Sequence, residues 1–152
     1  MTENTRLPSC SISKQFTCCV LLDKIAQVDR LDNSIKEFLP EFTGQLPTVK
    51  ELCHNQSGLR DYWALSILQG ATAEQTFERS DALPLLAKMK TGQFEPGTRY
   101  SYCNGNFRIL SELIETETGE SMEDLYFESI WKPASMHNTV LNSDTRFPTD
   151  NV

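Results

Sequence analysis

The hydrophobic residues of this chain recur with a helical period along most of its length. Between Ser11 and Gln27 they fall at steps of mostly three and four, a spacing that lines them along one face of an α-helix. The segment from Gly105 to Glu117 has the same spacing, and Gly119 follows it as a residue type that commonly ends helices. No segment alternates convincingly between apolar and polar residues, as a half-buried strand would. The pattern therefore predicts a mainly α chain.

Capping and turn residues predict shorter helices around these two. Thr48 and Glu51 have the spacing of a capping box, in which each side chain accepts a hydrogen bond from the other residue's backbone N–H. Thr72 and Gln75 repeat that spacing. The further segments that we expect to be helical are 33–39, 48 to near 57, 80 or 81 to 90 with Gly92 closing it, and 121–132.

Length and composition fit one globular domain over residues 1–152. Hydrophobic residues make up 39% of the chain, enough to build a core. The net charge of −7 repels nucleic-acid phosphates, so no nucleic acid is expected as a partner. No run approaches the ~20 apolar residues of a membrane span, and the segment from Met1 to Ser9 has no hydrophobic signal sequence. We therefore expect a cytoplasmic protein that does not contact a membrane.

The cysteines and histidines predict neither a disulfide framework nor a metal site. The chain has five cysteines, and an odd number without a secretion signal indicates free thiols. No Cys-x-x-Cys pair occurs, and the two histidines are His54 and His137. A structural zinc site normally draws on several such ligands at close spacing. We expect no metal and no cofactor.

Ser11 and Lys14 form a Ser-x-x-Lys sequence at the start of the first predicted helix. Residues three apart on a helix are surface neighbours, so the two side chains share a face. A serine there can attack a carbonyl carbon, and its own backbone N–H can hold the resulting oxyanion. The nucleophile needs a base, and a lysine can serve at neutral pH only if its surroundings lower its pKa. The other interpretation of the serine is a simple helix cap.

Tyr102 and Asn104 form a second candidate on the loop before the Gly105–Glu117 helix. In an extended loop, residues two apart point the same way, so both side chains could face a cleft while Cys103 points away. A phenol can pass protons, and a carboxamide offers a donor and an acceptor. The other interpretation is a buried tyrosine beside an Asn-Gly turn.

The two motifs together, in this order, resemble the serine β-lactamase and penicillin-binding-protein superfamily. The surrounding sequence extends the likeness from about residue 7 to residue 141. Residues 10–17 are similar to the nucleophile helix of that superfamily, and 94–106 are similar to its class C second motif. Residues 55–62 resemble its Ser-Gly-Leu turn. Within the superfamily, residues 55–65 and 101–110 are most similar to the D-stereospecific aminopeptidases.

The resemblance implies a role for each of the four residues. Ser11 would be the acylated nucleophile and Lys14 its proton acceptor. Tyr102 would relay the proton to the leaving amine, and Asn104 would orient Lys14 and the substrate amide. The implied activity is that of a D-aminopeptidase-like serine hydrolase, which cleaves small peptides or amino-acid amides through an acyl-enzyme.

A third motif of the superfamily is missing from its expected place. The resemblance implies a Lys-Ser/Thr-Gly or His-x-Gly sequence on a strand that follows Tyr-x-Asn. The sequence Lys90-Thr91-Gly92 has the right residues but precedes Tyr102, and the residues after His137 do not match. We therefore expect the helical region of the β-lactamase/transpeptidase-like fold, from the nucleophile helix through the Tyr-x-Asn loop and the helices after it. Most of the antiparallel sheet is expected to be absent.

This incompleteness leaves three hypotheses for the function. The chain is a serine hydrolase, an inactive helical remnant or interaction module, or an unrelated helical domain with accidental motif matches. Loss of one oxyanion donor raises a reaction barrier by roughly 2.7–4 kcal/mol, so we expect little or no activity from this chain alone. Without a sheet, an apolar face of the nucleophile helix should be exposed. A second copy, a partner chain or the missing sheet segment could cover it.

Overall fold

The computed structural model describes residues 6–72 and 79–141, and within these ranges it contains helices and no β-strand. The α-helices in these ranges are α1 (Ser13–Lys24), α2 (Ile35–Phe38), α3 (Val49–Cys53), α4 (Tyr62–Leu68), α5 (Ala82–Ala87), α6 (Asn104–Thr118) and α7 (Met122–Tyr126). Shorter turns are the 3₁₀ segments η1 (Cys10–Ile12), η2 (Val28–Ser34) and η3 (Arg79–Asp81), and the π-helical segment η4 (Phe127–Trp131). The prediction of a mainly α chain is confirmed.

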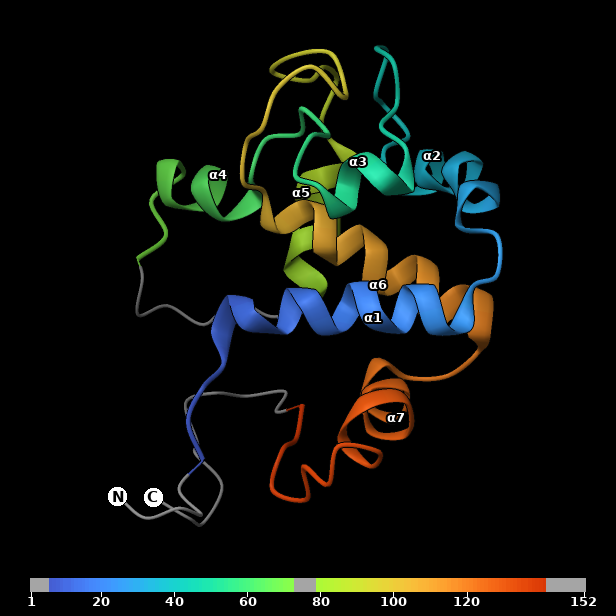
Figure 1. The fold of residues 1–152 in the computed structure, drawn as a ribbon. Helices are drawn as coiled ribbons and strands as arrows, with labels where there is room; N and C mark the ends of the chain where they lie inside the picture. The colour runs from blue at the N-terminus through green and yellow to red at the C-terminus, as the bar shows by residue number, and fades with distance from the viewer. Residues whose placement is uncertain (1–5, 73–78, 142–152) are drawn as a thin grey trace.

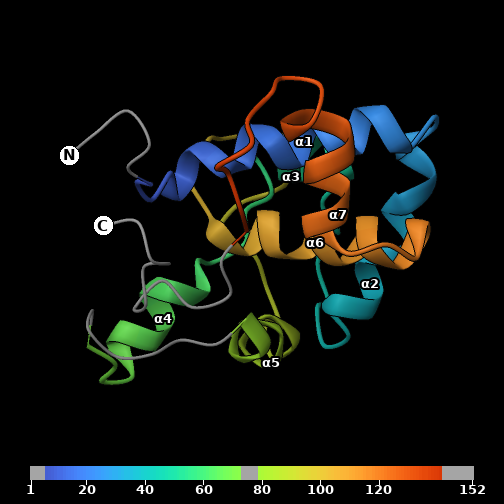
Figure 2. The ribbon, with the colours of Figure 1, turned by 90° about the horizontal axis from the view of Figure 1, so that it is seen from below.

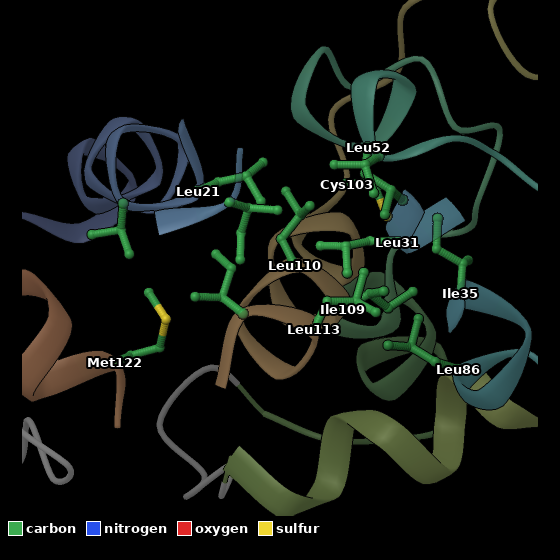
Figure 3. Close-up of a cluster of buried hydrophobic side chains, with 14 of the residues drawn as sticks. Leu21, Leu31, Ile35, Leu52, Leu86, Cys103, Ile109, Leu110, Leu113 and Met122 are labelled. Atoms are coloured by element: carbon green, nitrogen blue, oxygen red, sulfur yellow. The ribbon is translucent and has the colours of Figure 1, made fainter. Parts of the chain in front are cut away.

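Helix α6 lies at the centre of the molecule. It contacts α1, α3 and α5, among others, and it lies between α1 and α5 in both views of the ribbon (Figure 1, Figure 2). Its residues Ile109, Leu110 and Ile114 are fully buried. Side chains from the surrounding helices converge on this helix (Figure 3). Each buried leucine or isoleucine contributes about 1.5–3 kcal/mol of transfer free energy, so this core fixes the position of both ends of α6.

The local signals for helix ends predict several boundaries correctly. Thr48 and Glu51 form the expected capping box, with the Thr48 N–H donating to Glu51 Oε2 at 2.7 Å and the Glu51 N–H donating to Thr48 Oγ1 at 3.2 Å. Ser121 caps α7 by accepting from the Asp124 N–H at 3.2 Å. Gly119 ends α6 with a φ of 72°, a left-handed conformation that glycine adopts without strain.

Tertiary contacts move three other boundaries away from the predicted ones. Helix α5 ends at Ala87 and not at residue 90, and the chain beyond it joins another loop, where the Lys90 carbonyl accepts a hydrogen bond from the Thr43 N–H at 2.9 Å. Helix α3 ends at Cys53, because Asn55 adopts a left-handed φ of 55°. Helix α4 was not predicted at all. The possible capping box at residue 75 lies outside the described residues.

Helix α1 exposes apolar side chains on one face. Ile12, just before the helix, is 59% exposed and Leu22 is 72% exposed, and Cys19 between them is also exposed. Their spacing of seven and three places them on one side of the helix. The expected exposure of apolar residues is therefore observed, and what covers them stays a prediction. Among the helices of the described ranges, none is both long enough and apolar enough to cross a membrane.

Candidate active site

The structure brings together the four residues that the sequence motifs predicted. Ser11 lies in η1, Lys14 lies in the first turn of α1, and Asn104 is the first residue of α6. Helices α1 and α6 run side by side in the same direction, so their N-terminal ends lie on one side of the molecule (Figure 2). Tyr102 lies on the loop that enters α6. The site therefore depends on two helix starts that the core holds next to each other.

Hydrogen bonds connect the four side chains into one cluster. The Ser11 Oγ lies 2.6 Å from the Tyr102 hydroxyl oxygen, and the Lys14 Nζ donates to Ser11 Oγ at 3.2 Å. The Lys14 ammonium also donates to Asn104 Oδ1 at 2.9 Å. The Tyr102 hydroxyl donates to the same oxygen at 3.3 Å. The serine hydroxyl is thus in contact with a lysine and a phenol at once, and the carboxamide oxygen fixes both of these groups.

A sharp turn precedes the serine. Cys10 has a φ of 46°, which is uncommon for a residue with a side chain. The Ser13 hydroxyl donates to the Cys10 carbonyl at 2.7 Å, and the Ile12 N–H donates to the Ser9 carbonyl at 3.0 Å. These bonds close the turn and hold Ser11 at the exposed start of the helical segment.

Aromatic rings and a cavity adjoin the lysine. The Lys14 Nζ lies 5.0 Å from the centroid of the Tyr102 ring and 5.5 Å from that of Phe107, within the range of a cation–π interaction. A cavity of about 360 Å³ borders Lys14 and Asn104, and α1, α6 and α7 form its walls together with Tyr62. Phe107 follows Asn104 by three residues on α6, and this helical spacing was the available signal for its place beside the site.

The residue between the two motif side chains is buried. Cys103 is 0% exposed, so its side chain points away from the cluster as the alternation predicted. Burial raises the pKa of the Cys103 thiol to about 11. Burial likewise raises the pKa of the Tyr62 phenol. Neither group is therefore prepared for proton transfer at neutral pH.

The Lys90-Thr91-Gly92 sequence lies on a loop after α5. The Lys90 carbonyl accepts from Thr43, and the Thr91 carbonyl accepts from the Arg60 guanidinium. Its backbone therefore joins loops to each other instead of forming the edge of a sheet. Over residues 6–72 and 79–141, no three His, Cys, Asp or Glu side chains are grouped as metal ligands.

Comparison with known proteins decides the family. The family model described as Beta-lactamase matches residues 1–150. The chain belongs to the β-lactamase family. A D-aminopeptidase of Cereibacter sphaeroides is 62% identical to it over 152 residues, which are 100% of this chain and 30% of that relative. The chain therefore spans about a third of the length of this curated relative, and the predicted resemblance to the D-aminopeptidases is confirmed.

Solved structures show the same fold. A D-stereospecific amidohydrolase from a Streptomyces species superposes with a TM-score of 0.71 at 24% identity, over 88% of this chain and 43% of that one. The D-amino acid amidase of Ochrobactrum anthropi SV3, complexed with L-phenylalanine amide, gives a TM-score of 0.67 at 25% identity, over 99% of this chain and 43% of that one. The prediction of the helical region of the β-lactamase/transpeptidase-like fold is thus confirmed.

Proposed function

We propose that Ser11, Lys14, Tyr102 and Asn104 are the catalytic group of a serine hydrolase that acts on amide bonds through an acyl-enzyme. One observation carries this proposal. The Ser11 Oγ is within hydrogen-bond reach of both Lys14 and Tyr102, although the serine and the tyrosine are 91 residues apart. A nucleophile in contact with a base that a third group orients is the arrangement that nucleophilic catalysis requires.

The acylation step begins with the serine. The Ser11 Oγ attacks the carbonyl carbon of the substrate amide while its proton passes to the Lys14 Nζ, 3.2 Å away. The carbonyl oxygen becomes an oxyanion, for which we assign the Ser11 backbone N–H as one donor. The Tyr102 hydroxyl then gives its proton to the leaving nitrogen and is resupplied from the Lys14 ammonium. The C–N bond breaks, leaving an ester on Ser11 and a free amine.

The deacylation step repeats this proton path with water. A water molecule attacks the ester carbonyl and gives its proton to the Lys14 and Tyr102 pair. The bond between the carbonyl carbon and the Ser11 Oγ breaks, and the serine oxygen takes the proton back. The products are a carboxylic acid and the regenerated hydroxyl. Asn104 keeps the lysine in place in both steps, because its Oδ1 accepts from Lys14 at 2.9 Å.

We assign amino-acid amides and small peptides as substrates, with a D-residue on the acyl side of the scissile bond. The support is the chemistry named for the relatives, which include a D-aminopeptidase at 62% identity and a D-amino acid amidase of similar fold. Because the chain covers 30% of that D-aminopeptidase, the residues that select between D and L substrates can lie in the part that it does not cover.

A second candidate function is an inactive helical module that binds another polypeptide. Two observations favour it. The only Lys-Thr-Gly sequence precedes Tyr102 in the chain. Its Lys90 carbonyl forms a hydrogen bond with another loop, at Thr43. Along α1, Ile12 at its N-cap and Leu22 in its last turn are also exposed, and they form an apolar face on which the sheet of a longer chain or a second copy could lie.

Covalent labelling separates the two functions. The chain is incubated with a fluorophosphonate and with a penicillin-type probe, and the modified peptide is identified by mass analysis. The hydrolase proposal expects an adduct on Ser11 that the Ser11→Ala variant abolishes. Ser129→Ala is the matched control, because the Ser129 hydroxyl donates to Asp23 Oδ2 at 2.7 Å, near the C-terminal end of α1 and away from the cluster.

Turnover is then measured with D- and L-alaninamide. Ser11-dependent release of ammonia supports the hydrolase. Labelling without turnover supports a competent nucleophile in a chain that needs further residues for hydrolysis. If neither probe modifies Ser11, both here and in a longer chain carrying the family's third motif, the hydrolase proposal is wrong and the module remains.

A further inference from the structure

The backbone on both sides of Tyr102 is held by one residue. The Ser101 N–H donates to the backbone carbonyl of Asn55 at 2.9 Å, and the Cys103 N–H donates to the Asn55 side-chain Oδ1 at 3.1 Å. Asn55 therefore forms hydrogen bonds to the loop on both sides of the tyrosine, and we call such a residue a clamp. Tyr102 itself is 44% exposed, and these two bonds hold the backbone on either side of it.

The conformation of Asn55 explains why this residue can form both bonds. Its φ of 55° is left-handed, a conformation that asparagine tolerates better than most residues with a side chain. The Asn55 Oδ1 also accepts from Asn106 Nδ2 at 3.2 Å, and the Ser57 hydroxyl donates to Asn106 Oδ1 at 2.6 Å. Asn106 is fully buried in α6. The side chain that holds the loop is thus itself held by a buried polar network.

Asp61 holds the next residue of the motif in the same way. Its Oδ1 accepts from the N–H groups of Trp63 and Ala64 at 2.9 Å and 3.2 Å and caps α4. Its other oxygen, Oδ2, accepts from the Asn104 N–H. The residue at the N-cap position of α6, Cys103, makes no side-chain capping bond. Asp61 therefore caps the 15-residue helix α6 from outside, where a carboxylate is favoured by the helix dipole.

We propose that Asn55 and Asp61 are positioning residues for the reaction of Ser11. They fix the loop so that the Tyr102 hydroxyl stays 2.6 Å from Ser11 Oγ and Asn104 Oδ1 stays 2.9 Å from the lysine. This inference rests on the proposed hydrolase function. A displacement of about 1 Å in such a cluster lowers a rate by roughly 100-fold, so loss of either clamp slows the acylation of Ser11.

A pair of variants at Asn55 separates positioning from folding. Asn55→Gly keeps the left-handed backbone and removes Oδ1, whereas Asn55→Asp keeps an acceptor oxygen at the same place. The measured quantity is the rate of Ser11 modification by a fluorophosphonate, with the thermal unfolding midpoint measured in parallel. We expect Asn55→Gly to slow modification roughly 10- to 100-fold, and Asn55→Asp to restore it to within about three-fold of the wild-type rate.

A pair of variants at Asp61 separates its bond to the Asn104 N–H from its capping of α4. Asn is as good an N-cap as Asp, so Asp61→Asn retains the α4 cap through its carbonyl oxygen but turns an amide NH₂ toward the Asn104 N–H. Asp61→Ala loses both. We expect the two variants to slow Ser11 modification by a similar factor, roughly 10-fold or more, although only Asp61→Ala lowers the unfolding midpoint appreciably.

Hydrogen exchange of individual amides provides the readout that does not depend on activity. The Cys103 N–H bonds to the Asn55 side chain and the Asn104 N–H to the Asp61 side chain in the wild-type chain. The Cys103 N–H should therefore exchange faster in Asn55→Gly, and the Asn104 N–H faster in Asp61→Asn. Slower modification with unchanged exchange would overturn the inference, as would wild-type rates in both Asn55→Gly and Asp61→Asn. A wild-type chain whose Ser11 cannot be modified in any context would instead refute the proposed function.

Discussion

Replacement of Ser57 with alanine should destabilise this chain far more than the loss of one hydroxyl suggests. The Ser57 Oγ donates to Asn106 Oδ1 at 2.6 Å and accepts from the Leu59 N–H at 3.1 Å. Ser57 is 1% exposed and Asn106 is 0% exposed, so water cannot replace the lost partner. Each buried polar group left without a partner costs about 1–3 kcal/mol. With two such groups, the free energy of unfolding should fall by roughly 2–6 kcal/mol.

Urea unfolding followed by circular dichroism measures this change, with linear extrapolation to water. The unfolding temperature should fall by roughly 4–24 °C, since 1 kcal/mol corresponds to about 2–4 °C in a domain of this size. Ser66→Ala is the matched control. The Ser66 hydroxyl donates only to the Trp63 carbonyl of the preceding turn, at 2.8 Å, so its loss should cost about 1 kcal/mol or less. Equal destabilisation by the two substitutions would refute the reasoning.

Two other outcomes follow from the structure. A hydrogen bond with Cys53 lowers the pKa of the Cys18 thiol to about 7, so alkylation of Cys18 by iodoacetamide should rise with pH around a midpoint near 7. In Cys53→Ala that midpoint should move up toward the ordinary value, as peptide mass analysis of a pH series would show. Gly58→Ala should prevent stable folding, because a Cβ there would lie 2.2 Å from the Phe94 carbonyl oxygen. Gly119→Ala has open space at the Cβ position and should cost only about 1 kcal/mol in thermal unfolding, from its left-handed φ. Equal losses at the two glycines would contradict the steric argument.

Features that depend on neighbouring residues could be predicted from the sequence. The capping box of Thr48 and Glu51, the end of α6 at Gly119 and the shared face of Ser11 and Lys14 each involve residues within one helical turn. Helix geometry alone fixes such pairs, because residues three or four apart are always neighbours on a helix. The contact between Ser11 and Tyr102 spans 91 residues, and here the sequence offered only its resemblance to a known family.

Contacts between distant segments set the remaining features. Helix α5 stops at Ala87, and beyond it the Lys90 carbonyl bonds with the distant Thr43 N–H, a contact that no local pattern contains. No motif around Asn55 indicates its role. The role arises because Asn55, a left-handed residue after α3, forms hydrogen bonds with the loop before α6. Hydrogen bonds of this kind form only after the helices have packed, since burial of their apolar faces brings the polar groups together. The amino-acid sequence thus specifies the individual helices and the reactive side chains, while the packing around α6 determines which of those side chains come into contact.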